Sequence, residues 1–266
     1  MREKLFIGLP CYNEEKDINT LLDRILKVKQ KVQEKFNIDV EIFCVNDGSK
    51  DNTEKTIIDR EKDGVKLINH DVNKGLGEAM RTILMHFINQ GNENDYLVVM
   101  DSDNTHNPQY IIDMIEKQKQ EKEHIIIASR YQKGATITGL KKHRILLSDF
   151  AKIWYNIMLK IPNVKDYTCG YRLYTHEIAT KTYKKYRENV ITQSSFACMM
   201  EILYKMYLSG AIIGEIPFKL EYNLKEGTSK MKIIKTSINS IITTVKIKKQ
   251  GAKSKWKKLK KFYHML

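Results

Sequence analysis

Two aspartates separated by one residue, Asp101 and Asp103, directly follow the short apolar run 95–100. Such a run is typical of a buried parallel strand, which would carry both carboxylates to its C-terminal end. Open α/β sheets bind their ligands at that end. Two carboxylates so placed can hold a hard divalent cation while diphosphate oxygens take the remaining positions of the metal. The spacing alone is common in solvated turns, so its meaning depends on the residues around it.

Strands and helices alternate through the first half of the chain. Apolar periodicity predicts strands at 5–9, 40–45, 65–68, 97–100 and 125–128, and helices at 15–36, from 51, at 76–88 and after Pro108. This alternation predicts an α/β fold with a Rossmann-like, mostly parallel, doubly wound sheet. Beyond Tyr131 the alternation stops, and we expect helices at 144–160 and 196–209 and a strand pair at 211–221 bent at Pro217.

Three more polar segments follow predicted strands and should meet Asp101 at one sheet edge. They are 10–14, 46–49 and 73–79. Asp47 could bind a base or a ribose. Gly75 and Gly77 allow close backbone approach, and the N-terminus of the helix after them favours phosphate. Taken singly, these segments also suit helix caps and tight turns.

Composition narrows the class of protein. At 266 residues, with 42% hydrophobic residues, the chain can bury a large core and is not disordered throughout. Residues 1–4 lead straight into a strand, and no apolar run is long enough to span a membrane, so we expect a cytoplasmic location. The four cysteines lack a metal-binding or disulfide spacing, which predicts reduced, buried thiols.

The net charge of +14 belongs to the C-terminus. Residues 230–266 contain twelve lysines and no acidic residue, while residues 1–229 hold 34 basic and 32 acidic residues. The main domain therefore lacks the basic face expected of a nucleic-acid-binding protein.

Seven motifs occur in a fixed order between about residues 5 and 232: Pro10-x-Tyr12-Asn13-Glu14, Asp47-Gly48-Ser49, Asn73-x-Gly75-x-Gly77-x-Ala79, Asp101-x-Asp103, Ser129-Arg130-Tyr131, Asp166-x-Thr168-x-Gly170-Tyr171-Arg172 and Gly227-x-Ser229-Lys230. In these motifs the chain resembles family 2 glycosyltransferases, and within them the dolichol-phosphate mannosyltransferase branch.

This resemblance implies an A-type glycosyltransferase fold, a nucleotide-sugar donor, a Mg²⁺ or Mn²⁺ ion and inversion at the anomeric carbon. It implies a metal and diphosphate site at Asp101 and Asp103. The residues implied for the nucleotide pocket are Pro10, Tyr12, Glu14, Asp47, Lys74 and Gly75.

The second half of the chain favours a phosphate acceptor. Relatives that transfer to a sugar hydroxyl carry a carboxylate base in an acidic pair, and this chain shows no such pair. A phosphate is largely a dianion at neutral pH and can attack without a base if cations hold it. The predicted cations are Arg130, Arg144, Arg172, Lys225 and Lys230, with Ser229 beside the last and Asp166 orienting Arg172. Each cation could also be an ordinary surface charge.

Two departures from the branch concern the same region. Thr105 stands where the branch has a glutamine metal ligand, and Lys225 stands near the place of an arginine. A lysine supplies a point charge instead of a bidentate fork. His106 and His143 receive no catalytic role, because a metal that screens the diphosphate removes the need for an acid.

We therefore expect a catalytic domain over 1–229, with a nucleotide-sugar half at about 1–130 and an acceptor half at about 131–229. Its predicted reaction moves a hexose, foremost mannose from GDP-mannose, to a polyprenyl phosphate at the cytoplasmic membrane face. Alternatives are another donor such as UDP-glucose, a sugar-hydroxyl acceptor, or a non-catalytic nucleotide-sugar-binding or membrane-adaptor protein.

The segment 230–266 is predicted to contact an anionic membrane surface. Its apolar residues form one helical stripe, which could equally pack on the protein core: Ile234, Ile238, Ile241, Ile242 and Val245. Nine lysines at 246–261, with Trp256, Leu259 and Phe262 on one face, are typical of an interfacial anchor. Nucleic-acid or protein binding by this tail is the alternative.

Overall fold

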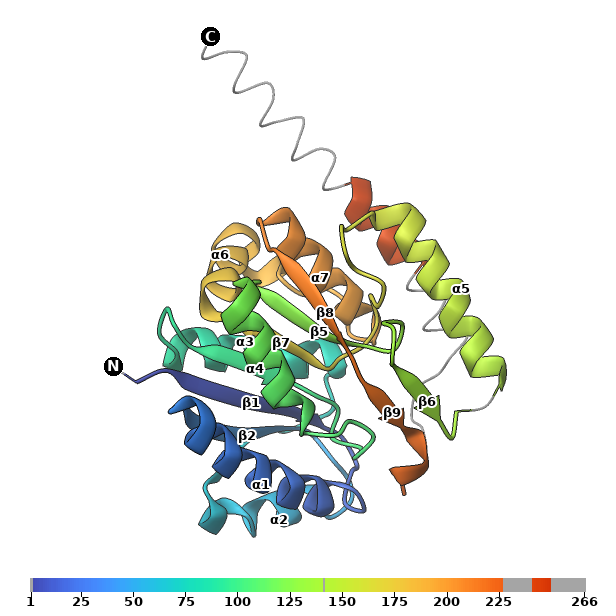
Figure 1. Cartoon of the computed structure of the whole chain (residues 1–266). Coiled ribbons are helices and arrows are strands. Elements are labelled where there is room, and N and C mark those ends of the chain that lie inside the picture. Colours follow the sequence, from blue (N-terminus) through green and yellow to red (C-terminus); the bar gives the residue numbers. More distant parts are fainter. Residues whose placement is uncertain (1, 141, 227–240, 250–266) are drawn as a thin grey trace.

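The computed structural model describes residues 2–140, 142–226 and 241–249, and the side chains of 142–147 are not among those described. A seven-stranded sheet forms the centre of the molecule (Figure 1). Its strands are β1 (Lys4–Cys11), β2 (Asp39–Asp47), β3 (Val65–His70), β4 (Tyr96–Val99), β5 (Ile125–Ser129), β7 (Arg172–Thr175) and β8 (Ile213–Pro217).

The sheet is mostly parallel, as the alternation predicted. The strand order is β3-β2-β1-β4-β7-β5-β8, and only β7 runs antiparallel, between β4 and β5. The chain therefore reverses direction beside the strand that carries the aspartates. A separate pair, β6 (Thr136–Thr138) with β9 (Lys219–Glu221), lies beyond the sheet edge. The sequence did not predict β6 or β7, which are only three and four residues long.

Helices cover both faces of the sheet. On one face α1 (Ile18–Phe36) packs beside α4 (Tyr110–Glu121), and on the other α3 (Leu76–Gln90) packs beside α6 (His176–Tyr186) and α7 (Ala197–Leu208). The short α2 (Thr53–Ile58) adjoins α1. Helices α1, α3 and α4 bury apolar residues at helical spacing, which is why the sequence predicted them. Helix α6 was not predicted, because it buries only Ile178, Ala179 and Thr182.

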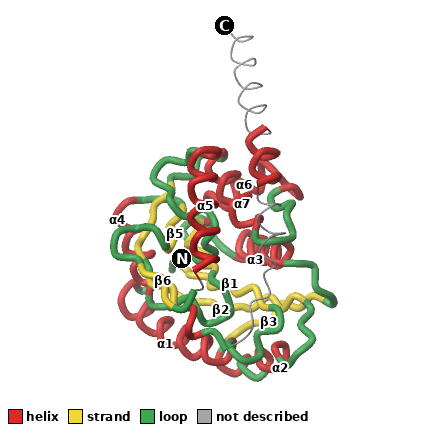
Figure 2. The backbone as a smooth tube through the Cα atoms, turned by 90° about the vertical axis from the view of Figure 1, so that its right-hand side faces the viewer, coloured by secondary structure: helices red, strands yellow, loops and turns green. Residues whose placement is uncertain are grey.

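Helix α5 (Lys142–Leu159) lies apart from these layers, at the edge of the molecule in Figure 1 and on its near side in Figure 2. It buries Tyr155 and Leu159 against the core. The predicted helix at 144–160 and the predicted strand pair bent at Pro217 are both present, the latter as β8 and β9.

Packing is close where α3 crosses β1. A Cβ atom on Gly8 would lie 2.7 Å from the side chain of Ile83. All four cysteines are buried free thiols, as the sequence predicted. Among the helices that the structure describes, none has both the length and the apolar character needed to cross a bilayer.

Residues 241–249 are helical. Their buried side chains are Thr243, Thr244 and Ile247, whereas Ile241 and Ile242 of the predicted apolar stripe are exposed. Packing of the stripe on the core, the alternative that the sequence left open, does not hold for these two residues. Ile234, Ile238 and the lysine-rich segment from 250 onward lie outside the described residues.

Candidate active site

The two aspartates lie in the loop that follows β4, at the carboxyl edge of the sheet. Asp103 is held on both oxygens. Its Oδ1 accepts a hydrogen bond from the Thr105 hydroxyl at 2.6 Å, and its Oδ2 accepts one from the Lys225 ammonium at 2.7 Å. Lys225 follows β9 and the short 3-10 helix Tyr222–Leu224, so this contact joins the aspartate loop to a segment 122 residues further along the chain.

Electrostatics couple these groups. Burial raises the pKa of Asp101, and the Asp103 carboxylate adds to this rise, while His106 foremost and then Lys225 and Arg130 oppose it. Burial also acts upward on Asp103, but the Lys225 ammonium prevails and lowers the pKa of that carboxyl. The site thus contains the carboxylates of Asp101 and Asp103, and the Lys225 ammonium is bound to the second. This donor set fits a hard divalent ion, and Asp101 and Asp103 would hold it.

Thr105 and His106 fix the aspartate loop. Thr105, which stands where the branch has a glutamine, is buried. Its hydroxyl donates a hydrogen bond to Asp103 and so orients that carboxylate. His106 Nδ1 accepts the Asp101 backbone N–H at 3.1 Å, and its ring stacks on Tyr171 with centroids 5.1 Å apart. Its Nε2 lies 3.8 Å from Asp101 Oδ2. These contacts suit a positioning role for His106.

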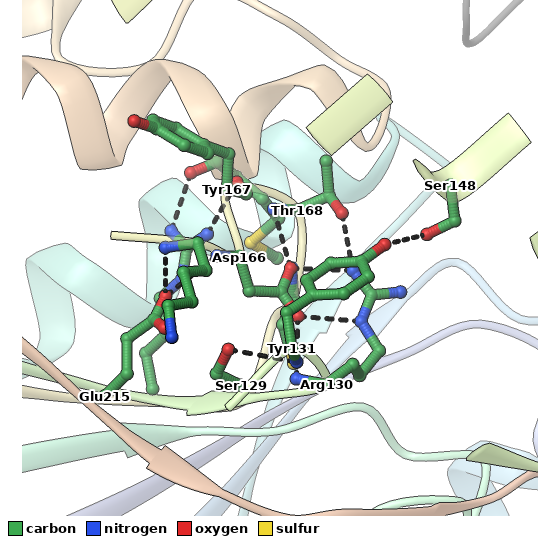
Figure 3. Close-up of polar contacts among 12 residues, drawn as sticks. Ser129, Arg130, Tyr131, Ser148, Asp166, Tyr167, Thr168 and Glu215 are labelled. Atoms are coloured by element: carbon green, nitrogen blue, oxygen red, sulfur yellow. Dashed lines mark hydrogen bonds and ion pairs between the residues drawn. The ribbon is translucent and has the colours of Figure 1, made fainter. Parts of the chain in front are cut away.

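Arg130 and Asp166 form a bidentate ion pair (Figure 3). Arg130 Nε and Nη2 donate to the two Asp166 oxygens at 2.8 and 2.7 Å, and Nη2 also donates to the Thr168 hydroxyl at 2.6 Å. The sequence assigned Asp166 to Arg172, and the structure corrects this partner to Arg130. Although burial acts to raise it, the Arg130 guanidinium lowers the pKa of Asp166 to about 2.

Glu215 of β8 supports this pair and was missed by the sequence analysis. Its Oε1 accepts the backbone N–H groups of Lys165 and Asp166 at 2.7 and 2.8 Å, and its Oε2 accepts from the Gln132 amide (Figure 3). The loop that carries Asp166 is therefore tied to the sheet. An acidic residue inside an otherwise apolar strand was the available signal.

Arg172 lies elsewhere than the predicted acceptor cluster. Its side chain is 0% exposed in β7, and its Nη1 and Nη2 atoms donate to the backbone carbonyls of Met199 and Tyr167 at 2.6 and 2.8 Å. The guanidinium thus joins β7 to α7 and to the Asp166 loop. We therefore treat Arg172 as a positioning residue and no longer as a direct phosphate ligand.

The loops after β1 and β2 are joined by hydrogen bonds. The backbone N–H of Asn13 donates to the Ser49 hydroxyl at 2.9 Å, and that of Glu14 donates to the Thr53 hydroxyl at 2.7 Å. The Pro10 carbonyl accepts the Ser102 hydroxyl at 2.7 Å, which connects β1 to the aspartate loop. Tyr12, between these anchored residues, is half-buried. Pro10, Tyr12 and Glu14 therefore stand at the same edge as Asp101.

Asp47 orders the glycine loop. Its Oδ1 accepts the backbone N–H of Lys74 at 3.0 Å and lies 2.7 Å from His70 Nδ1, while its Oδ2 accepts the N–H of Gly75 at 2.8 Å. Gly75 has a φ of +91°, which favours glycine. The sequence predicted a ligand contact for Asp47, and the structure adds this positioning role.

The backbone that lies close to Gly77 belongs to another loop of the protein. A Cβ atom there would lie 1.8 Å from the Gln193 carbonyl oxygen, and the Gly77 N–H donates to the Ser194 carbonyl at 3.2 Å. The first turn of α3 thus meets the loop 191–196, where the sequence expected phosphate to approach. The sequence analysis missed this loop.

A buried charge cluster holds the loop 191–196. Glu201 of α7 is 0% exposed and accepts the backbone N–H groups of Thr192 and Gln193 at 2.8 and 2.9 Å. Its other oxygen binds the buried Lys205 ammonium, which also donates to the Asn189 carbonyl at 2.5 Å. Two charges inside the apolar helix 197–208 were the sequence signal for this cluster.

Three predicted acceptor residues lie outside the described side chains. Arg144 is in the first turn of α5, but its side chain is not described, and Ser229 and Lys230 are in the segment 227–240. His143 is likewise not described.

Comparisons with known proteins identify the family. The model of the family described as "Glycosyl transferase family 2" matches residues 6–183. A dolichyl-phosphate beta-glucosyltransferase of Trichomonas vaginalis is 28% identical over 240 residues, which are 86% of this chain and 68% of the relative. A dolichol-phosphate mannosyltransferase of Pyrococcus furiosus is 32% identical over 232 residues, which are 86% of this chain and 59% of the relative. The chain thus spans between about one half and two thirds of the curated relatives it matches.

Solved structures support the fold. Glucosyl-3-phosphoglycerate synthase of Mycobacterium tuberculosis, crystallised with Mn²⁺, uridine diphosphate and phosphoglyceric acid, superposes with a TM-score of 0.63 at 17% identity, covering 92% of this chain and 78% of its own. Mannosyl-3-phosphoglycerate synthase of Rubrobacter xylanophilus gives 0.59 at 15% identity, covering 90% and 73%. With its mostly parallel sheet, the paired aspartates after β4 and the matching family model, the chain belongs to glycosyl transferase family 2 and has the A-type glycosyltransferase fold.

Proposed function

We propose that the chain is a metal-dependent, inverting glycosyltransferase that moves a hexose from a nucleotide sugar to a polyprenyl phosphate. One observation carries this proposal. At the carboxyl edge of the sheet, Asp101 and Asp103 share their surroundings with two cations of the acceptor half, Lys225 and Arg130. This combination suits a reaction between two phosphorylated substrates, one bound through a metal and one through cationic side chains.

The acceptor phosphate would attack the anomeric carbon of the donor. The bond from that carbon to the diphosphate breaks as the new bond forms, and the nucleoside diphosphate leaves with the electron pair. Arg130 is fixed by Asp166 through Nε and Nη2, so we expect its remaining nitrogen, Nη1, to receive the acceptor phosphate. Lys225 would add positive charge beside Asp103. A divalent ion on Asp101 and Asp103 would supply screening of the diphosphate charge.

For the sugar we propose mannose, as the name of the Pyrococcus furiosus relative suggests, with GDP-mannose as its donor. Glucose is the second candidate, because two of the relatives from Trichomonas vaginalis are dolichyl-phosphate beta-glucosyltransferases. We propose that the reaction takes place at the cytoplasmic face of a membrane, where a nucleotide sugar and the head group of a polyprenyl phosphate can meet.

The test offers a panel of labelled nucleotide sugars together with polyprenyl phosphate and Mn²⁺ and measures organic-soluble product. We expect one hexose nucleotide to give product, and we expect chelation of the metal to stop it. Product with a sugar-hydroxyl acceptor but not with lipid phosphate would favour a polysaccharide transferase. Donor binding without transfer to any acceptor would favour the non-catalytic alternative.

A further inference from the structure

The outward face of α5 is apolar. Phe150, Ile153 and Ile157 recur at helical spacing and are 59%, 58% and 60% exposed. The opposite face of the helix is buried through Tyr155 and Leu159. A helix on the surface of a globular protein normally presents polar residues outward, and a gathered apolar stripe marks an interaction site.

A second helical segment near α5 also exposes apolar side chains. Ile241 and Ile242 of residues 241–249 are 36% and 60% exposed, and Figures 1 and 2 place this segment near the C-terminal end of α5. Within the described part of the chain, these two helical segments hold five of the nine large hydrophobic side chains that are exposed. We call the surface formed by Phe150, Ile153, Ile157, Ile241 and Ile242 the α5 face.

Helix α5 is also joined to the active site, through residues on the side opposite Phe150. Ser148, half a turn before Phe150, shares a hydrogen bond of 2.6 Å with the Tyr131 hydroxyl (Figure 3). Lys152 places its Nζ 4.3 Å from the centroid of the Tyr131 ring. Tyr131 follows Arg130 directly, so α5 is joined to the residue proposed to hold the acceptor phosphate.

We propose that the α5 face docks into the interfacial layer of an anionic lipid bilayer and so presents Arg130 to the membrane. This inference rests on the proposed function, in which the acceptor's phosphate is anchored in a bilayer by its apolar chain. Charge also favours lipid over a second copy of the chain. The segment from Lys246 to Lys261 begins in the same helical segment and carries nine lysines and no acidic residue, which complements anionic head groups and repels its own copy.

A matched pair of variants tests the docking surface. Ile153→Glu places a charge on the α5 face, and Ile212→Glu makes the same change before β8 at an equal exposure of 58%. The full chain is mixed with vesicles of phosphatidylcholine and phosphatidylglycerol at physiological salt, and the bound fraction is measured by sedimentation. We expect Ile153→Glu to weaken vesicle binding about tenfold or more, because the bilayer would no longer bury an isoleucine side chain at this position. We expect Ile212→Glu to bind vesicles as the unmodified chain does.

A second readout separates this inference from the function. Transfer is measured to long-chain polyprenyl phosphate in the vesicles and to a short, water-soluble isoprenyl phosphate. We expect Ile153→Glu to lose the first and keep the second. If no acceptor is used by any form of the chain, the proposed function fails, while the vesicle measurement still decides the docking surface.

Equal vesicle binding by the two variants would overturn the docking proposal, whatever the transfer results. So would a dimer that Ile153→Glu dissociates while vesicle binding is unchanged, because the α5 face would then be a contact between copies. If Ile153→Glu does not fold, Ile153→Ser and Ile212→Ser repeat the comparison with a smaller perturbation.

Discussion

At the scale of single residues, the site is built from carboxylates whose charge is balanced by cations distant in the chain. Asp103 meets Lys225 and Asp166 meets Arg130, each at 2.7 Å. The sequence predicted all four residues as part of the site or beside it, but it paired Asp166 with Arg172. Which charged residues pair depends on where the loops lie in the folded protein. The spacing of apolar residues in the sequence does not contain this information, so these pairings could not be predicted.

The first prediction concerns Asp103. Replacing it with asparagine keeps the volume of the side chain but removes the charge proposed to hold the metal. We expect Asp103→Asn to lower transfer about a hundredfold or more and to leave the folded state intact. Turnover with saturating Mn²⁺ and the midpoint of thermal unfolding measure the two effects. Asp59→Asn, an exposed position on the C-terminal side of α2, is the control. Near-normal turnover of Asp103→Asn would exclude the metal-binding role.

A second prediction concerns Asp166. Its pKa of about 2 lies below the ordinary value of 3.8, so the ion pair stabilises the fold above pH 4 and loses this contribution as the pH falls toward 2. We expect the difference in unfolding free energy between the unmodified chain and Asp166→Asn to shrink by about 2 kcal/mol over that range. Urea denaturation at pH 5 and near pH 2 measures this difference.

Glu41 provides the control for that experiment. A hydrogen bond from His86, opposed by burial, lowers the pKa of Glu41 to about 2. The contribution of Glu41 to the stability of the fold is therefore lost over the same range as the pH falls. Because the two sites are separate, Glu41→Gln should not alter the pH dependence attributed to Asp166. A constant difference between the unmodified chain and Asp166→Asn from pH 5 to pH 2 would show that the ion pair is not stabilising.

At the scale of elements, the sequence predicted the strands and helices with strong periodicity and missed the short or polar ones. β1 to β5 were predicted within a few residues, because each contains closely spaced apolar residues. β7 was missed because its four residues begin with the charged Arg172 and end with the polar Thr175. The antiparallel direction of β7 has no sequence signal, since it follows from how the segment after α5 returns to the sheet.

The loop 191–196 illustrates the same limit and gives a third prediction. Glu201 connects α7 to this loop, which packs on Gly75 and Gly77. We expect Glu201→Gln to lower the unfolding free energy by about 3 kcal/mol, because it leaves the Lys205 ammonium buried without its partner. Chemical denaturation measures the loss. The double variant with Lys205→Met should recover part of it, and an additive loss in the double variant would contradict a coupled pair.

At the scale of the whole molecule, charge and apolar surface are distributed unevenly. Residues 250–266 contain six lysines, while the α5 face contributes exposed apolar side chains. An electrostatic attachment weakens with salt, whereas an apolar one does not. The two contributions to membrane binding can therefore be measured separately.

The fourth prediction concerns this C-terminal segment. Deleting residues 250–266 should weaken binding to anionic vesicles about tenfold or more at low salt, because each lysine near the surface contributes about 1 kcal/mol. Donor binding in solution should not change. Sedimentation over a range of salt concentrations measures the effect, and the full chain and the truncated chain should converge at high salt. If the truncated chain sediments as well as the full chain at physiological salt, the tail is not the anchor.

The contact between Lys225 and Asp103 bears on the order in which ligands arrive. Lys225 is already paired with the carboxylate, so a free divalent ion would have to displace this ammonium group from Asp103. If the ion came together with a nucleotide diphosphate, the diphosphate would offer the displaced lysine new anionic partners. Metal and donor should therefore bind cooperatively, and thermodynamic linkage requires each to strengthen the other by the same factor. When the nucleotide departs, the lysine can return to Asp103, so the carboxylate is neutralised again before the next donor binds.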